Sequence, residues 1–402
     1  MTRAVFEDST AAAEENPRID WDAETAVPEW LQEEIKKVEM TTVADAAKRG
    51  KTEAGIEVLL TGASSFPGSH ILTALLHHPS VRKVHCIAVP SDHHHQLSSS
   101  IPSASVAEVA YYTGTLLSKN LGLTPTERNH LAQTVHIIVH TAAHGHCLNR
   151  FATLRRPNLE ALHSLASLSL ASSLTSGSAS SSLCKTAIPI LYLSSPRTLL
   201  LAGTSETPRP PSSLRDFPPP AVDGSDGYTA SKWAGEVFLE NLISPSLNIA
   251  VHRSCTLVSS QAPNSDAMNG ILRYSLAMRT VPRLRRAKGF LDFAPLDDVV
   301  GRIAAAAVEL ASVPRGTSPS VAEASPPSSS IHFRHHSGGI KTPFSQFRTH
   351  METVYGGAFD EVDMQEWLVR AARQGLDPLI TAYIEALLES GMPLVSPYLG
   401  EE

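Results

Sequence analysis

Residues Glu57-Val-Leu-Leu-Thr-Gly-Ala-Ser-Ser-Phe-Pro-Gly68 run from an apolar strand into a turn that contains glycine. A helical pattern follows at residues 69–78, and a second apolar strand is predicted at 83–89. A strand, a glycine-containing turn, a helix and a second strand in this order are typical of the start of a Rossmann-like parallel sheet. This stretch therefore predicts the fold class and the edge of the sheet where a ligand would bind.

Further apolar segments downstream have the length of buried strands and alternate with helical patterns. They lie at residues 107–112, 135–140, 188–193 and 247–252. Strands that alternate with helices favour a parallel sheet covered by helices on both faces. The predicted fold class is therefore α/β, a Rossmann-like doubly wound parallel sheet with a smaller, mainly helical C-terminal lobe.

Composition and periodicity divide the chain into three parts. Residues 1–54 are polar and acid-rich, and we expect a linker that leads into a helix over 28–49. Residues 55–255 are expected to form the Rossmann-like domain. Residues 256–402 should form the smaller lobe over the ligand edge of the sheet, with a substrate-binding and carrier-binding role. Its apolar residues recur with helical spacing in 344–355 and 364–388.

Three stretches are rich in serine: 93–104, 164–183 and 312–330. We expect the first and the third to be surface loops, whereas leucine and alanine in the second predict a helix at its start. The run His93-His94-His95 lies in the first stretch. Consecutive residues do not share a helix face and no acidic cluster accompanies them, so no metal site is predicted.

The charge and the cysteines restrict the class of protein. The net charge of −7 argues against nucleic acid and against an anionic membrane as partners. No apolar run approaches the roughly 18 residues of a membrane span, and the N-terminus lacks the apolar core of a signal peptide. The four cysteines show no metal-binding spacing, so we expect reduced thiols in a cytoplasmic protein.

Tyr228-Thr-Ala-Ser-Lys232 places a tyrosine one helical turn before a lysine, and Ser194-Ser195 ends a predicted strand upstream. A cation close to a phenol lowers its pKa from about 10 by roughly 1–3 units, which prepares the hydroxyl for proton transfer. The family resemblance described below implies that the catalytic set is Ser195, Tyr228 and Lys232, with Ser194 as the alternative serine. The simpler interpretation is that Tyr228 and Lys232 are only neighbours on one helix.

Six segments carry a resemblance to one family. They are Ile19-Asp-Trp-Asp-Ala-Glu24, Leu60-Thr-Gly-Ala-Ser-Ser-Phe-Pro-Gly68, Val84-His-Cys-Ile-Ala-Val89, Leu154-Arg-Arg-Pro-Asn158, Asp223-Gly-Ser-Asp-Gly-Tyr-Thr-Ala-Ser-Lys-Trp-Ala-Gly-Glu236 and Leu291-Asp-Phe-Ala-Pro-Leu-Asp-Asp298. From residue 57 to about 300 the chain resembles the reductase-type release domains of fungal polyketide–peptide megasynthases. Those domains belong to the extended short-chain dehydrogenase/reductase family. The resemblance implies that Asn158 is structural and that the substrate is a thioester on the phosphopantetheine of an upstream peptidyl carrier domain.

The same resemblance places the coenzyme loop at Gly62, Ser65 and Gly68, where the sequence departs from the family pattern. Ser65 replaces the second glycine, so a side chain lies where the pyrophosphate needs close approach to the backbone. Pro67 precedes the third glycine and has no N–H to offer a phosphate. The loop is therefore expected to bind a coenzyme weakly or not at all.

Two further departures also fall on the coenzyme side. Pro90 stands where an Arg usually holds the 2′-phosphate of NADPH, and Thr115 stands where an Asp is expected beside the adenine. Together the four changes weaken NADPH binding by roughly 10²–10⁴-fold. The alternative is a variant that still binds NADPH through residues near the second strand, namely Arg82, Lys83 or His93.

The resemblance implies two competing reactions. The first, which we expect, is redox-independent Dieckmann cyclisation of a β-ketoacyl-aminoacyl thioester to a tetramic acid (pyrrolidine-2,4-dione), with no cofactor required. The second is NADPH-dependent reductive release as an aldehyde or alcohol. A third hypothesis is a docking module without activity. His144 and His146 are further candidates for the base, although lone histidines are more often structural.

Overall fold

The computed structural model describes most of the chain. The described residues are 18–42, 55–100, 105–145, 148–174, 187–202, 211–242, 247–285, 287–312, 331–339, 342–390, 395–397 and 399. Within these ranges no helix combines the length and the apolar character that a membrane crossing requires.

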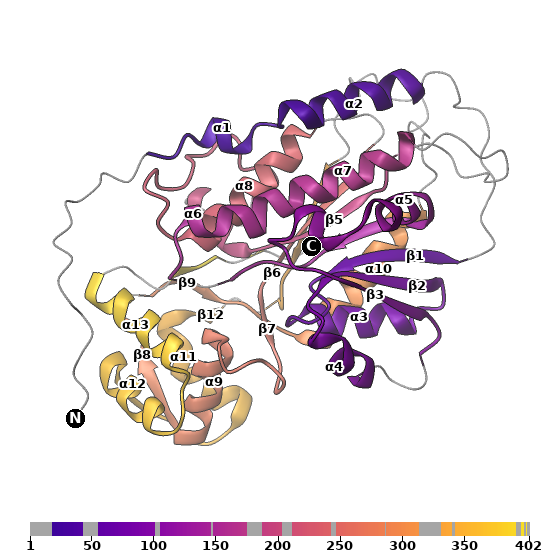
Figure 1. Cartoon of the computed structure of the whole chain (residues 1–402). Helices are drawn as coiled ribbons and strands as arrows, with labels where there is room; N and C mark the ends of the chain where they lie inside the picture. Colours follow the sequence, from indigo (N-terminus) through magenta and orange to yellow (C-terminus); the bar gives the residue numbers. More distant parts are fainter. Residues whose placement is uncertain are drawn as a thin grey trace, which may run out of the picture.

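A seven-stranded sheet forms the centre of the molecule (Figure 1), with the strand order β11-β6-β5-β4-β1-β2-β3. Its strands are β1 (Ile56–Thr61), β2 (Val81–Val89), β3 (Glu108–Thr113), β4 (Ile137–His140), β5 (Ile190–Ser194), β6 (Ile249–Ser254) and β11 (Ile331–His336). Every neighbouring pair is parallel. The predicted α/β class and the six predicted strands are confirmed, and β11 is an additional strand.

Helices cover both faces of this sheet. On one face α3 (Gly68–His77) packs against α10 (Leu296–Ser312). The other face is covered by α7 (Ala161–Leu174) and α8 (Gly227–Asn241), and α5 (Pro125–Thr134) packs on α7. The shorter elements near these layers are α4 (His93–Ser100), α6 (Phe151–Leu154), η1 (Lys119–Gly122), η2 (Arg155–Glu160) and η3 (Pro196–Ala202).

The N-terminal segment packs on the outside of the helical layer. Helix α1 (Trp21–Thr25) contacts α8, and α2 (Glu29–Thr42) lies along α7. Trp21 is buried between the rings of Phe151 and Trp233, with ring centroids 4.8 and 5.5 Å away. The N-terminal helix was predicted over 28–49, and its described part ends at Thr42.

A second hydrophobic core, centred on the buried Trp367, belongs to the C-terminal lobe. Its helices are α9 (Ala267–Met278), α11 (Phe347–Tyr355), α12 (Met364–Arg373) and α13 (Pro378–Ser390), with η4 (Phe344–Gln346). Its short strands are β7 (Thr256–Val258), β8 (Thr280–Arg283), β9 (Lys288–Leu291), β10 (Phe293–Pro295), β12 (Thr342–Pro343), β13 (Asp360–Asp363) and β14 (Val395–Ser396). The helical patterns at 344–355 and 364–388 are thus confirmed. Two elements beyond residue 256, α10 and β11, belong to the layers of the central sheet.

One serine-rich stretch was predicted wrongly. Residues 93–104 were expected to form a loop, but α4 occupies His93–Ser100. Leu97 is buried and anchors this helix, and the Ser98 hydroxyl donates to the carbonyl of His94. The helix expected at the start of 164–183 is confirmed by α7, whereas residues 313–330 lie outside the described residues.

Candidate active site

A cavity of about 880 Å³ lies at the carboxyl ends of β1, β4, β5 and β6. This is the edge where open parallel sheets bind their ligands. The C-terminal lobe closes the cavity with an apolar wall that includes Met268, Ile271, Ile380, Ile384 and Leu387. Residues of this lobe therefore lie over the carboxyl edge of the central sheet.

All three predicted catalytic residues, Ser195, Tyr228 and Lys232, line this cavity. Tyr228 and Lys232 lie on α8, whose first turn is capped by Asp226 through a hydrogen bond from the Thr229 N–H. Gly227 is required at this helix start because a Cβ there would come within 2.3 Å of the backbone of Arg150. The start of α8 therefore packs against the chain just before α6.

Lys232 is buried, with 2% of its surface exposed. Its Nζ donates a hydrogen bond of 2.7 Å to the carbonyl oxygen of Leu193 and lies 4.7 Å from the centroid of the Tyr192 ring. Burial lowers the pKa of Lys232 to about 8, and the nearby carboxylate of Glu236 opposes this shift. The amine is therefore partly neutral near pH 8.

Tyr228 experiences a different set of charges. Burial raises the pKa of Tyr228, the guanidinium of Arg197 lowers it, and Asp226 raises it. Among the described residues, no hydrogen bond joins Tyr228 to Lys232. Arg197 is therefore the cation that lowers the pKa of the Tyr228 phenol. No sequence pattern identified this residue.

The two neighbouring serines have different partners. The hydroxyl of Ser194 donates a short hydrogen bond to Oε1 of Glu236, while the Ser195 hydroxyl accepts one of 3.2 Å from the N–H of Arg197. Thr198 donates to the carbonyl of Ser195 and so fixes the turn after β5. The geometry therefore favours Ser195, rather than Ser194, as the serine available to a ligand.

Glu236 belongs to an ion pair directly behind this site. Nη2 of Arg253 lies 2.6 Å from Oε2 of Glu236, and both side chains are completely buried. Arg253 also donates to the carbonyls of Pro211 and Ser212. A buried charge that is paired and hydrogen-bonded in this way fixes its surroundings, here the end of β5 and the middle of α8.

Asn158 joins the β4 loop to α8, as the resemblance implied. Its Oδ1 accepts from the N–H of His144 over 2.7 Å, and its Nδ2 donates to the carbonyl of the same residue and to the hydroxyl of Ser231. The side chain of His144 is exposed and does not line the cavity. The structure therefore gives His144 no contact with the cavity, and His146 lies outside the described residues.

The loop after β1 reaches the cavity through Ser65 and Pro67. The Ser65 hydroxyl donates 2.7 Å to the carbonyl of Gly62, and Pro67 precedes α3 without a capping side chain. A Cβ at Gly68 would lie 2.0 Å from the carbonyl oxygen of Gly62. Tight packing of the loop on itself therefore explains why a glycine is needed at position 68.

Two of the three alternative NADPH ligands, Arg82 and Lys83, lie away from the cavity. Arg82 pairs with Glu57 at the start of β1, and Lys83 pairs with Glu108 at the start of β3. Both lie at the end of the sheet opposite the cavity, so they cannot replace an Arg at Pro90. The third alternative, His93, begins α4 and donates its backbone N–H to the carbonyl of Pro90 at the carboxyl end of β2, so it stays close to the position of the missing Arg. Thr115, which stands in place of the expected Asp, bonds to Ser118 in the loop after β3. None of these four residues lines the cavity.

Cys255 also lines the cavity, and it is a free, buried thiol. Burial raises its pKa to about 12, so the thiolate is scarce at neutral pH. Cys86 is likewise free and buried. Neither of these two cysteines forms a disulfide with a described residue, and the other two cysteines lie outside the described residues.

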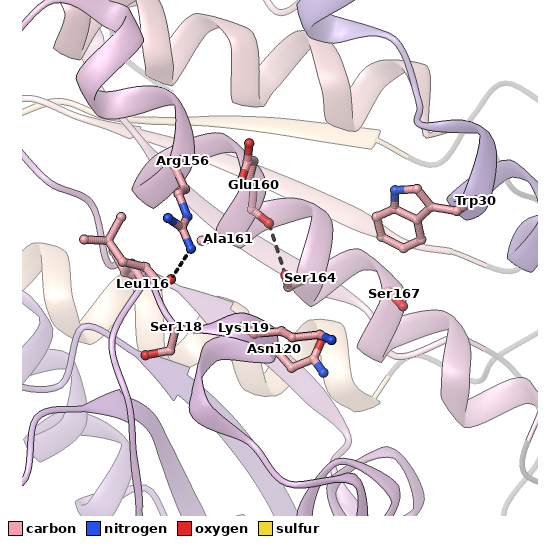
Figure 2. Close-up of a pocket in the computed structure, with 11 residues that line it drawn as sticks. Trp30, Leu116, Ser118, Lys119, Asn120, Arg156, Glu160, Ala161, Ser164 and Ser167 are labelled. Atoms are coloured by element: carbon pink, nitrogen blue, oxygen red, sulfur yellow. Dashed lines mark hydrogen bonds between the residues drawn. The ribbon is translucent and has the colours of Figure 1, made fainter.

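A smaller cavity of about 390 Å³ lies between α2, α7 and the loop around η1 (Figure 2). Arg156 donates to the carbonyl of Leu117 at its wall, and the Ser164 hydroxyl donates to the carbonyl of Glu160. Trp30 stands at its rim. The predicted site residues do not line it, so the larger cavity is the candidate active site.

The sheet order and the placement of serine, tyrosine and lysine at one cavity define a Rossmann-like protein of the extended short-chain dehydrogenase/reductase type. Residues 60–303 match the model of an NAD-binding family described as male sterility protein. The chain belongs to this family.

Three relatives show where such a chain occurs. The chain is 48% identical over its whole length to 9% of the hybrid PKS-NRPS synthetase iliA of Neonectria sp. (strain DH2). It is 38% identical over its whole length to 10% of the tenellin synthetase of Beauveria bassiana. Over 77% of its length it is 50% identical to the polyketide synthase-related protein Dhc1 of Alternaria cinerariae, of which it covers 64%. The chain thus spans about a tenth of each of the two synthetases.

Solved structures support the same fold. The reductase (R) domain of a nonribosomal peptide synthetase from Mycobacterium tuberculosis superposes with a TM-score of 0.59 at 20% identity, over 91% of this chain and 88% of that one. The terminal R domain from the myxalamid PKS-NRPS pathway gives a TM-score of 0.57 at 19% identity, over 91% and 88%. At these identities the comparison establishes the fold.

Proposed function

We propose that this chain releases a carrier-bound product by Dieckmann cyclisation, without a redox step. One observation carries the proposal: Ser195, Tyr228 and Lys232 share a large cavity with an apolar wall, while the loop expected to hold a coenzyme contributes a serine side chain and a proline. The cavity thus contains hydrogen-bond donors for an oxygen that gains negative charge, whereas the loop that would bind a coenzyme is altered.

The relatives suggest the substrate class. They are hybrid PKS-NRPS synthetases, which join polyketide and peptide chemistry. We propose a β-ketoacyl-aminoacyl thioester on the phosphopantetheine of an upstream peptidyl carrier domain. The apolar wall formed by α9 and α13 suits the acyl chain, because burial of apolar surface favours binding by about 25 cal/mol per Å².

The reaction needs a base, a stabilised oxyanion and an oriented chain. Neutral Lys232, whose pKa is about 8, is proposed to take the acidic proton between the two carbonyls. The carbanion attacks the thioester carbonyl, a carbon–carbon bond forms, and the carbon–sulfur bond breaks. The carrier thiolate leaves and takes up a proton. Tyr228 and Ser195 donate hydrogen bonds to the oxygen that carries the transient charge.

The residues present suit NADPH poorly. The hydroxyl of Ser65 bonds within the loop at a position where a pyrophosphate requires bare backbone. Pro67 offers no N–H at the start of α3, and Pro90 offers no charge at the end of β2. The proposed cyclisation therefore has no step that uses the coenzyme.

Reductive release remains the second candidate because two observations favour it. The family is an NAD-binding family, and the reductase domains of known structure share the fold. Ser195, Tyr228 and Lys232 all line the cavity, and the two hydroxyl groups would hydrogen-bond the thioester carbonyl in that reaction as well. NADPH affinity separates the two candidates.

Calorimetric titration of the purified chain with NADPH up to millimolar concentration tests the proposal. We expect no binding by the natural chain. In the double variant Ser65→Gly, Pro90→Arg, restored backbone approach and a guanidinium should strengthen binding by ~10-fold or more. Micromolar binding by the natural chain would instead support reductive release.

A further inference from the structure

Arg197 is held in place from two sides of the site. Its backbone N–H donates to the hydroxyl of Ser195 over 3.2 Å. Its side chain donates from Nε to Thr229 over 3.1 Å and from Nη2 to Asp226 over 2.9 Å. The guanidinium is therefore fixed between the turn after β5 and the first turn of α8, where it lines the cavity.

In the sequence, Tyr228 lies between Asp226 and Thr229, the two residues whose side chains hold this guanidinium. Lys232, the cation that the motif suggests for Tyr228, instead donates to the carbonyl of Leu193. Both of these cations line the cavity, and Arg197 is the one held by residues close to Tyr228 in the chain. An arginine stays charged at every physiological pH, so its effect on Tyr228 is permanent.

The charged and titratable groups around Tyr228 come from several elements. Those described are Arg197 on η3, Asp226 before α8, Lys232 and Glu236 on α8, Tyr192 on β5, and Tyr383 on α13 near Arg197. Arg197 favours the ionised phenol, whereas Asp226 and burial disfavour it. Removal of the charge of Arg197 should therefore raise the pKa of Tyr228, whereas removal of the charge of Asp226 should lower it.

We propose that Arg197 is a positioning residue of the release reaction, whose guanidinium, held by Asp226 and Thr229, strengthens the hydrogen bond from Tyr228 to the reacting oxygen. This inference rests on the proposed cyclisation for its chemistry. Its electrostatic part concerns the free protein and is independent of the substrate. The nearest alternative is a purely structural role, in which Arg197 only links η3 to α8.

The test compares Arg197→Gln, Arg197→Lys and Asp226→Asn. The pKa of Tyr228 is read from tyrosinate absorbance as the difference between each protein and the same protein with Tyr228→Phe. We expect Arg197→Gln to raise this pKa by about 1 unit. In Arg197→Lys, which keeps a positive charge, the pKa should stay close to that of the natural protein. Asp226→Asn should lower it, and it keeps the helix cap because Asn caps as well as Asp.

The same variants are then assayed for cyclisation of a pantetheine thioester. We expect kcat to fall ~10–100-fold in Arg197→Gln and to recover partly in Arg197→Lys, since a donor to the developing charge acts mainly in the transition state. Arg370→Gln, which breaks an exposed ion pair with Glu366 on α12, is the matched control and should keep full activity.

A folded Arg197→Gln variant with an unchanged Tyr228 pKa would overturn the inference, even if its activity fell, because a structural role would then suffice. An unchanged kcat in Arg197→Gln would overturn it as well. If the natural chain makes no tetramic acid, the proposed function fails instead. The tyrosinate titration, which needs no substrate, would still decide whether Arg197 acts on Tyr228.

Discussion

Nζ of Lys232 lies 2.7 Å from the carbonyl oxygen of Leu193, and this hydrogen bond ties the middle of α8 to the end of β5. Ser194 and Ser195 follow Leu193 directly, so one contact holds both elements that carry the proposed catalytic residues. Burial of the amine, rather than this hydrogen bond, lowers the pKa of Lys232 to about 8. The lysine therefore has both a structural and a chemical part in the site.

Tyr228→Phe should slow product release. Loss of the hydroxyl removes one donor to the oxygen that gains charge, which typically lowers kcat by roughly 10²–10³-fold. The measurement is a single-turnover assay with a pantetheine thioester substrate. Unchanged tetramic acid formation would remove Tyr228 from the mechanism.

The rate of release should depend on the ionisation of Lys232. If the neutral amine takes the proton, kcat rises as the pH increases through about 8, the pKa of Lys232 in the folded protein. The free energy of unfolding should also rise with pH between pH 8 and about 10.5, because Lys232 binds more protons in the unfolded state than in the folded state over this range. A pH–rate profile measured from pH 6 to pH 10 tests this, with Lys232→Met as the control. A flat profile across pH 8 would exclude Lys232 as the base.

The buried pair of Arg253 and Glu236 should matter more for stability than an exposed pair. Arg253→Met leaves the Glu236 carboxylate buried without its cation and should lower the free energy of unfolding by ~3–5 kcal/mol. The matched control is Arg334→Met, which breaks the exposed pair with Glu309 and should cost at most about 1 kcal/mol. Urea unfolding of both variants measures the difference, and equal costs would contradict this account of the pair.

Trp21 should anchor the N-terminal segment on α8. It packs on Phe151 and Trp233, and its Nε1 donates 2.8 Å to the carbonyl of Pro220. Trp21→Ala should therefore destabilise the fold by ~3–5 kcal/mol. Trp30→Ala, at a position 49% exposed on α2, is the matched control and should change stability by no more than about 0.5 kcal/mol. Similar melting temperatures for the two variants would show that α1 does not support α8.

The central strands were predictable from sequence because they are buried on both faces and form continuous apolar runs. Strand β11 (Ile331–His336) was missed because it lies at the edge of the sheet and alternates apolar with polar residues. It also follows a long serine- and proline-rich stretch that interrupts the pattern. Helix α4 (His93–Ser100) was missed because its polar composition gives little helical periodicity, and the buried Leu97 alone marks its inner face.

The site was predictable only in part. The spacing of Tyr228 and Lys232 and the sequence motif around them identified three residues that the structure brings together at one cavity. The role of Arg197 depends on contacts with a helix that begins about thirty residues later, which no local pattern reveals. His144 shows the opposite case, because a histidine after a strand suggested a base and its side chain is exposed.

The most direct test of redox-independent release uses the purified chain, a β-ketoacyl-aminoacyl pantetheine thioester and no coenzyme, with the product identified by mass spectrometry. We expect a tetramic acid to form at the same rate with and without NADPH, with no loss of NADPH absorbance and no product from Tyr228→Phe on the same timescale. An aldehyde or alcohol that forms only when NADPH is present, with matching consumption of NADPH, would contradict cyclisation and assign the chain to reductive release.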